Sequence, residues 1–222
     1  MSGLKVITGP SIEPITLSEA RNHLRLDLDV DDTLVNTYIQ ASRNWAENYT
    51  GRAFINRTMQ MFLDGFRIGD SPLWEGMKTG PYVVNYSNII ELGLTPVSSL
   101  SSINYYTDDD TQHVWAASNY YVDLISEPAK IVIRDGGTYP TSLRPANGLE
   151  INFVAGYGDN TTDVPQAIRL AMLQFMAYLY EHRGDYDGNI EAPSILRGLL
   201  EPFKVYRFNN NPYNTIVRSG IA

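Results

Sequence analysis

Carboxylates are the residues of this chain whose types and spacing could do chemistry. One acidic run is Asp108–Asp110, and a second set comprises Asp185, Asp187 and Glu191. Two carboxylates that face each other across a cleft can act as acid and base in glycoside cleavage. Both runs lie beside turn-forming residues, where acids are ordinarily solvated. We therefore expect no catalytic residue among these carboxylates. A carboxylate-dependent hydrolase is kept as a third interpretation of function, after the two that are given at the end of this section.

A run of alternating acids, Asp27–Asp32, invites comparison with a calcium-binding loop. Such a loop needs Gly at its sixth position and Glu at its twelfth, where this chain has Asp32 and Tyr38. We interpret the run as a solvated turn whose last Asp caps the following helix. The chain has three histidines, far apart and outside any metal-binding spacing: His23, His113 and His182. No metal site is expected.

Nucleotide and nucleophile motifs are also lacking. The chain contains no G-x-S-x-G elbow and no P-loop, and Gly156-Tyr157-Gly158 lacks the third glycine of a dinucleotide fingerprint. Cysteine is absent, which excludes disulfides, thiol chemistry and thiolate metal ligands. We expect no cofactor and no enzymatic activity.

Length and charge narrow the class of protein further. The 222 residues suffice for one large domain or two small ones, and 43% hydrophobic residues are typical of a globular chain. Met1–Pro10 lacks the features of a signal peptide, and no stretch could span a membrane, so no membrane partner is expected. The net charge of −8 argues against a sequence-reading nucleic-acid binder. It does not argue against a protein that lines a channel through which DNA slides.

The stretch that organises the chain is Val164–Gly184, which predicts a long helix. One apolar face recurs at helical spacing, and a second apolar row, from Leu170 to Tyr180, lies on another side. A helix that is apolar nearly all round is buried on most sides. It is either the central helix of one domain or a helix whose extra apolar side meets another subunit. The residues expected in the core or at a subunit interface are Ile168, Met172, Phe175, Met176 and Leu179.

Three further helices and a set of strands are expected around it. Thr16 and Glu19 form a capping box for a helix to about Leu26, a second helix covers Thr33–Tyr49 before Gly51, and a short one covers Pro193–Leu200. Between them, β-branched and aromatic runs alternate with turn residues. The expected strands are Thr58–Leu63, Tyr82–Val84, Ile89–Leu94, Ser99–Tyr106, Val114–Ala116, Tyr120–Leu124, Lys130–Arg134 and Leu149–Val154.

The predicted fold class is therefore α+β. It consists of a small α-helical bundle of about four helices (12–56 and 156–201), an inserted antiparallel β-module (57–155) and an extended C-terminal arm (202–222). The arm has a charge of +3 and is too apolar for a segment that stays in water. It either docks on a partner's groove or sheet edge, or packs back on its own acidic body. The residues expected to dock are Phe203, Val205, Tyr206, Arg207, Phe208, Tyr213, Ile216 and Val217.

The order of motifs resembles the phage head–tail connector family, the adaptor proteins below the portal in long-tailed phages and gene transfer agents. The resemblance covers residues from about 12 to about 206, and the β-region is longer than in smaller members. The motifs are Pro14–Ala20, His23–Arg25, Asp31-Asp32 with the helix end Glu47–Arg52, Pro96–Leu100, Tyr105-Tyr106, Tyr120–Asp123, Phe153–Gly158, Val164-Pro165 and Tyr180–Gly184.

The resemblance implies a structural part of the virion, at the head–tail interface. Its subunits would form a dodecameric ring that joins the portal protein to a stopper or tail-completion protein. DNA would pass through the lumen without sequence-specific binding, and assembly would take place in the bacterial cytoplasm. The alternative is a virion-associated β-module that binds carbohydrate or another tail protein through its aromatic residues.

Overall fold

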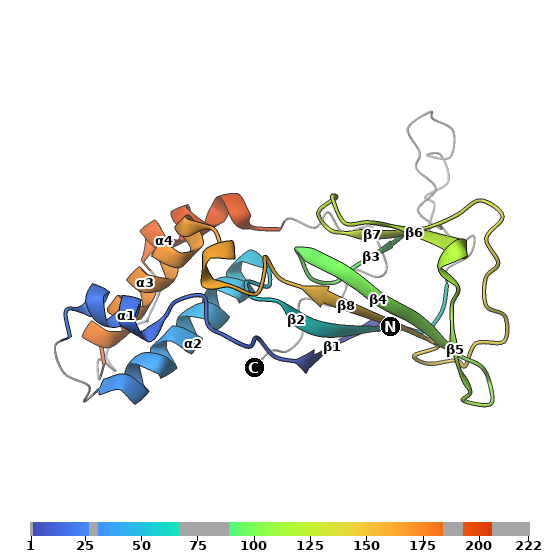
Figure 1. Cartoon of the computed structure of the whole chain (residues 1–222), viewed down its shortest axis with the longest axis horizontal. Helices are drawn as coiled ribbons and strands as arrows, with labels where there is room; N and C mark the ends of the chain where they lie inside the picture. Colours follow the sequence, from blue (N-terminus) through green and yellow to red (C-terminus); the bar gives the residue numbers. More distant parts are fainter. Residues whose placement is uncertain (1, 27–30, 67–88, 184–192, 206–222) are drawn as a thin grey trace. The chain divides into compact units, whose positions relative to one another are not determined.

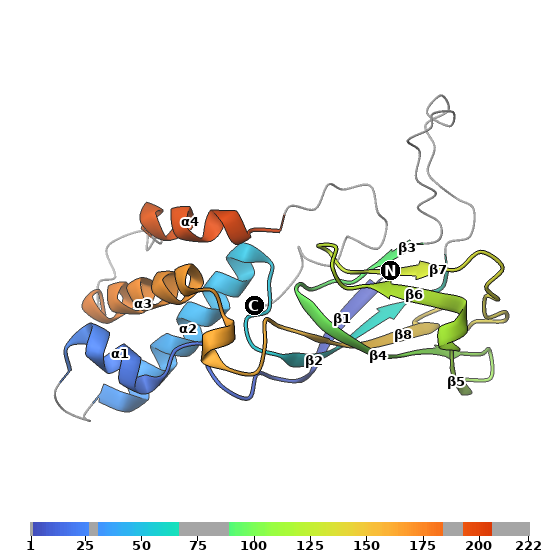
Figure 2. The same ribbon diagram turned by 45° about the horizontal axis from the view of Figure 1, so that its top comes forward.

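A computed structural model describes residues 2–26, 31–66, 89–183 and 193–205 (Figures 1 and 2). Within them the chain forms two compact units. The helical unit comprises residues 9–57 and 155–205, and the β-unit comprises residues 2–8 and 58–154. The expected boundaries differ from these at the amino terminus, where the first strand joins the β-unit, and after residue 201, where the chain stays with the helices. The fold class is α+β, as predicted.

The helical unit contains four α-helices whose ends follow from local sequence. Thr16 caps α1, since its hydroxyl accepts from the Glu19 N–H at 3.2 Å while the Glu19 carboxylate accepts from the Thr16 N–H at 2.9 Å. Gly51 ends α2 in the left-handed conformation (φ 72°). Both expectations are confirmed. The bounds are α1 (Leu17–Leu24), α2 (Asp32–Thr50), α3 (Gln166–Glu181) and α4 (Ser194–Leu200).

The acids before α2 do not cap it as expected. Asp31 occupies the N-cap position without a side-chain cap bond, and its carboxylate instead accepts from the Tyr180 hydroxyl at 2.5 Å. Asp32 forms an ion pair with Arg21 of α1. The capping interpretation was wrong because partners on two other helices take both carboxylates. Residues 27–30 of the proposed calcium loop lie outside the described residues.

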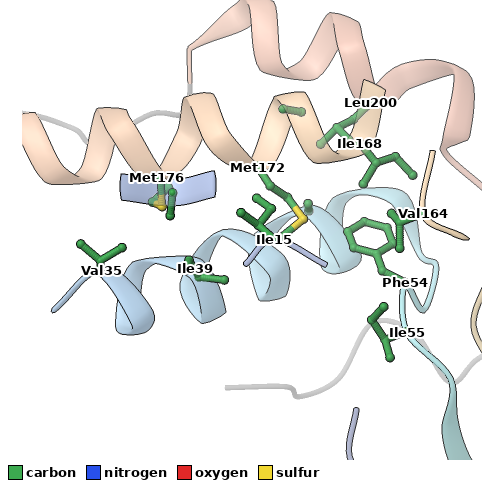
Figure 3. Packing of buried hydrophobic residues seen from close by; sticks show 13 residues of the cluster. Ile15, Val35, Ile39, Phe54, Ile55, Val164, Ile168, Met172, Met176 and Leu200 are labelled. Carbon is green, nitrogen blue, oxygen red and sulfur yellow. The ribbon is translucent and has the colours of Figure 1, made fainter. Parts of the chain in front are cut away.

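The core of the helical unit lies between α2 and α3, with α1 and α4 packed against them (Figure 3). Met172 and Met176 point from α3 toward α2, where they lie among aliphatic side chains. Among the described residues, no helix is long and apolar enough to cross a membrane. The buried members are Ile15, Ala20, Val35, Ile39, Ala46, Phe54, Ile55, Val164, Ile168, Ala171, Met172, Met176 and Leu200.

The β-unit contains two sheets. The larger has the strand order β1-β2-β8-β4-β5 and the smaller has the order β3-β7-β6. The pairs β1–β2, β4–β5, β3–β7 and β6–β7 are antiparallel. The bounds are β1 (Ser2–Thr8), β2 (Arg57–Leu63), β3 (Ile89–Glu91), β4 (Val97–Tyr106), β5 (Gln112–Val114), β6 (Tyr120–Asp123), β7 (Lys130–Ile133) and β8 (Leu149–Ala155).

One strand that was not expected and two that were expected need comment. The amino-terminal strand β1 was not predicted. The strand expected at Val114–Ala116 lies two residues earlier, as β5. Trp115 then turns inward and is only 3% exposed. The strand expected at Tyr82–Val84 lies outside the described residues.

Candidate functional site

The inner face of α3 is formed by the residues that the sequence singled out. Ile168, Met172 and Met176 are fully buried in the core, and Phe175 is 8% exposed. The Phe175 ring contacts Trp45 of α2, with ring centroids 4.5 Å apart. Leu179 is half-buried and lies outside the core cluster, so of its two expected places the subunit interface stays a prediction.

The outer side of α3 offers a narrower apolar surface than expected. Leu173 and Tyr180 pack partly against the core, and Ala177 is half-buried. Leu170 is 43% exposed. Ile195 of α4 is also exposed, at 63%. These two aliphatic side chains are the exposed large apolar residues on the described parts of α3 and α4.

Arg169 is polar in sequence yet buried in the structure. Its Nε donates to the Pro14 carbonyl at 3.1 Å, and its guanidinium pairs with Glu19, so α3 is tied to the start of α1. Burial alone would raise the pKa of Glu19, but hydrogen bonds from Thr16 and Arg169 hold this pKa below its ordinary value. The sequence did not reveal this role, because the partners lie about 150 residues away.

Glu47 is the centre of a second buried polar cluster. Its carboxylate accepts from the Phe54 N–H at 2.9 Å, pairs with Arg57 and lies 3.4 Å from Arg43. Arg43 also pairs with Glu13 at 2.7 Å. Burial alone would lower the pKa of Arg43, but the two carboxylates raise it. The cluster fixes the end of α2 to the segment that leads into β2.

The carboxyl-terminal segment Glu201–Val205 is anchored to the end of α2. Arg52 donates from Nε to the Phe203 carbonyl at 2.5 Å, and the Val205 N–H donates to the Thr50 carbonyl at 2.8 Å. The Phe203 side chain packs partly against the helical core. The first residues of the expected arm therefore pack back on their own unit. The other residues expected to dock lie outside the described residues: Tyr206, Arg207, Phe208, Tyr213, Ile216 and Val217.

The acidic run Asp108–Asp110 forms the tip of the β4–β5 hairpin. Hydrogen bonds from the hydroxyl groups of Thr107 and Thr111 lower the pKa of Asp109 to about 2. Asp110 pairs with Arg144 at 3.2 Å. These carboxylates hold a turn through hydrogen bonds and an ion pair. Asp185, Asp187 and Glu191 lie outside the described residues.

The histidines and the other potential ligands show no clustering. His23 and His113 are exposed, and His182 is the C-cap of α3. Within the described ranges, no group of three or more His, Asp or Glu side chains is placed to hold a metal ion.

The β-unit buries one carboxylate among neutral partners. Glu150 on β8 is 6% exposed and accepts from the Tyr106 hydroxyl at 2.6 Å and from Asn104 at 3.0 Å. Burial alone would raise the pKa of Glu150, yet these hydrogen bonds and one from Asn152 hold it below its ordinary value. The network joins β4 to β8 and fixes their relative register.

Four aromatic residues in the described part of the β-unit pack on one another. Trp115 contacts Phe66 and Tyr120, with ring centroids 4.8 Å and 5.1 Å apart, and Phe66 contacts Tyr139 at 5.2 Å. The carbohydrate alternative requires exposed aromatic platforms. This cluster uses its rings for the core of the unit.

Comparisons with known proteins give two results. Residues 14–78 match the family model of phage gp6-like head–tail connector proteins. No curated protein sequence matches the chain at a significant level.

Solved structures match nearly the whole chain. A chain from the neck of an empty gene transfer agent (GTA) particle, computed with C6 symmetry, is 22% identical with a TM-score of 0.70. A chain from the virion of a native GTA particle is 21% identical with a TM-score of 0.71. A chain from the neck of a native GTA particle, computed with C12 symmetry, is 22% identical with a TM-score of 0.67. Each match covers 92% of this chain and 96% of the other.

The family match begins at Pro14, just before the capping box of α1, and includes α2 with its Gly51 end. The structural matches extend the shared fold over the β-unit and α3. The family model therefore supports the resemblance to the phage head–tail connector family over residues 14–78, and the solved structures show a shared fold over 92% of the chain.

Proposed function

We propose that this protein is a head–tail connector of a tailed phage or gene transfer agent, built into the neck of the particle. The observation that carries the proposal is the shared fold with GTA neck chains over 92% of this chain and 96% of theirs. The connector family match at residues 14–78 points the same way. The role is structural and non-enzymatic, and it places the protein in the virion after assembly in the bacterial cytoplasm.

The proposed assembly is a closed dodecameric ring with head-to-tail contacts between neighbouring subunits. The similar necks were computed with C6 and C12 symmetry, which supports a ring with twelve positions. The exposed side chains Leu170 and Ile195 are suited to the subunit contact, because each would leave water on assembly. The ring joins the portal protein on one side to a stopper or tail-completion protein on the other.

The portal contact is proposed for residues after Val205. Because Val205 is hydrogen-bonded to Thr50, the arm leaves the helical unit from a fixed point. Residues 206–222 contain Arg207 and Arg218 and no acid. Their apolar residues, among them Phe208, Ile216 and Val217, supply anchors for a groove or sheet edge of the portal.

The net charge of −8 fits a channel through which DNA passes. Like charge repels the phosphate backbone, so the wall does not form the counterion-releasing contacts that hold DNA to a protein. DNA therefore passes through the lumen without sequence-specific binding.

The test is cryo-electron microscopy of particles purified from producing cells. We expect the chain in a ring of twelve copies between the portal and the tail. A single isolated copy, or absence of the chain from the particle, would overturn the proposal. Monomers in dilute solution are consistent with it, because the portal can template the ring.

A further inference from the structure

The amino-terminal strand β1 lies at one edge of the five-stranded sheet (Figure 1). Its inner edge pairs with β2 in register, with Leu4 opposite Met61 and Val6 opposite Met59. Among the described residues, no strand lies along its outer edge. An edge strand presents a row of unpaired N–H and C=O groups, which is a template for another extended chain.

The side chains of β1 are unusual for a protected edge. Natural edges are blunted by charge, proline or short length. Here Val6 is 46% exposed and the next residue, Ile7, is 48% exposed. Lys5 is the one charged residue on the strand, and the register shifts after Val6, so Ile7 has no residue opposite it.

The face of the sheet at Gly3 is open. A Cβ added at Gly3 would meet no atom within 4 Å. Leu4, in contrast, is covered, because its methyl groups lie 3.6 Å and 3.7 Å from the Cβ position of Gly93. The exposed aliphatic surface therefore begins after Leu4 and continues along Val6 and Ile7.

We propose that the outer edge of β1 binds an extended segment of a different protein, which adds a sixth strand to the sheet. Main-chain hydrogen bonds would provide the affinity, and side-chain pairs would set the register. The partner segment carries apolar side chains near Val6 and Ile7 and an acid opposite Lys5, because opposite charges on facing strands attract.

The strand itself argues against a second copy of this chain as the occupant. Lys5 is the central residue of β1, so a symmetric antiparallel β1–β1 pair places Lys5 opposite Lys5. Like charges directly opposite each other destabilise a pair. A second copy could instead offer another of its sheet-edge strands to β1. In the described part of the chain these are β3, β5 and β6, which have only three or four residues, against seven in β1.

The first test is photo-crosslinking of the full chain in producing cells. A photo-reactive phenylalanine analogue replaces Ile7, and a matched control carries it at Ile125, which is 95% exposed but lies on the loop after β6. We expect the Ile7 variant to crosslink to an acid-containing segment of one other protein, and the control not to reach that segment. Crosslinks to a second copy or to the chain's own C-terminal residues would overturn the proposal.

The second test is amide hydrogen exchange of the same native complex against the free chain. Successive N–H groups of a strand point to opposite edges. We expect every second amide of residues 3–8 to exchange at least about tenfold more slowly in the complex than in the free chain. Equal exchange of β1 in both states would overturn the proposal. If particles then contained twelve copies with β1 unprotected, the inference would fail while the neck role stood.

The third test uses substitutions on β1. Lys5→Glu should weaken partner binding about tenfold without a change in Tm, whereas Lys5→Arg should retain binding. Lys5→Pro and Val6→Pro each remove one backbone N–H, and these two groups point to opposite edges of β1. The variant that loses the N–H facing β2 should have a lower Tm than the unaltered chain. The other removes an outward N–H, keeps Tm and loses the partner. Partner binding that is unchanged in both Lys5→Glu and the stable proline variant would overturn the proposal.

Discussion

The anchored segment Glu201–Val205 allows the stability of the helical unit to be separated from the function of the arm. We consider two shortened chains, one ending at Glu201 and one ending at Val205. The shorter chain loses the packing of Phe203 on the core, the bond from Arg52 to the Phe203 carbonyl and the bond from Val205 to Thr50. The longer chain keeps all three.

The expected cost follows from these contacts. Partial burial of Phe203 contributes about 1–2 kcal/mol. The bond from the buried Arg52 guanidinium contributes about 1.5–3 kcal/mol, and the main-chain bond to Thr50 about 0.5–1.5 kcal/mol. Because such terms overlap, we expect a total loss of about 3–5 kcal/mol, which lowers Tm by on the order of 10 °C for a chain of this size.

The assay is thermal unfolding followed by circular dichroism at the helical minimum. The chain ending at Val205 should keep its Tm within about 2 °C, since it retains every contact that anchors the segment. It should nonetheless lose binding to the portal. If the chain ending at Glu201 were equally stable, the anchor would contribute little and our assignment of these contacts would be refuted. If the chain ending at Val205 bound the portal normally, the docking surface would lie elsewhere.

Three further perturbations test the core and the turns. Phe175→Ala should cost about 3–5 kcal/mol in chemical denaturation, whereas Leu179→Ala, at a half-buried site, should cost clearly less; equal losses would contradict the burial difference. Glu47→Ala should cost about 3–5 kcal/mol because it leaves the largely buried Arg57 guanidinium without its carboxylate, whereas Arg43 keeps Glu13; a neutral result would contradict the role of that cluster. The pKa of Asp109 in the folded chain is about 2, which is below the ordinary value of an Asp in an unfolded chain. The ionised carboxylate therefore contributes fully to folding stability above that ordinary value, and this contribution is lost as pH falls toward 2. In Asp109→Ala, Tm should therefore fall less steeply over that acid range than in the unaltered chain. If Tm depended on pH in the same way in Asp109→Ala and in the control Asp108→Ala, Asp109 would not stabilise the turn.

Local signals in the sequence predicted the helices well. The capping box at Thr16 and the glycine at Gly51 act within a few residues, so their structural effect can be inferred from neighbouring letters. The inner face of α3 was also predictable, because apolar spacing records which side is buried. The resemblance to the connector family, which the family model supports over residues 14–78, rested on the order of such local motifs.

Non-local partners account for what the sequence did not reveal. The strand β1 is held by pairing with β2, more than fifty residues later, and its own sequence shows no alternating pattern. The burial of Arg169 was not predicted, because its partner Glu19 lies on α1, far away in the sequence. Asp32 was expected to cap α2 for the same reason, and it pairs with Arg21 instead, while Asp31 accepts from Tyr180.

The division of the helical unit by the β-unit has a consequence for synthesis on the ribosome. The helices α1 and α2 emerge first, but α3, which completes their core, follows only after the whole of β2 to β8. At about 5–20 residues per second, α2 waits for roughly 6–26 s before α3 can cover its apolar face. The β-strands that emerge meanwhile can pair with one another before α3 exists. Nascent chains of this protein therefore expose an unpaired amphipathic helix to chaperones for most of the time that their translation takes.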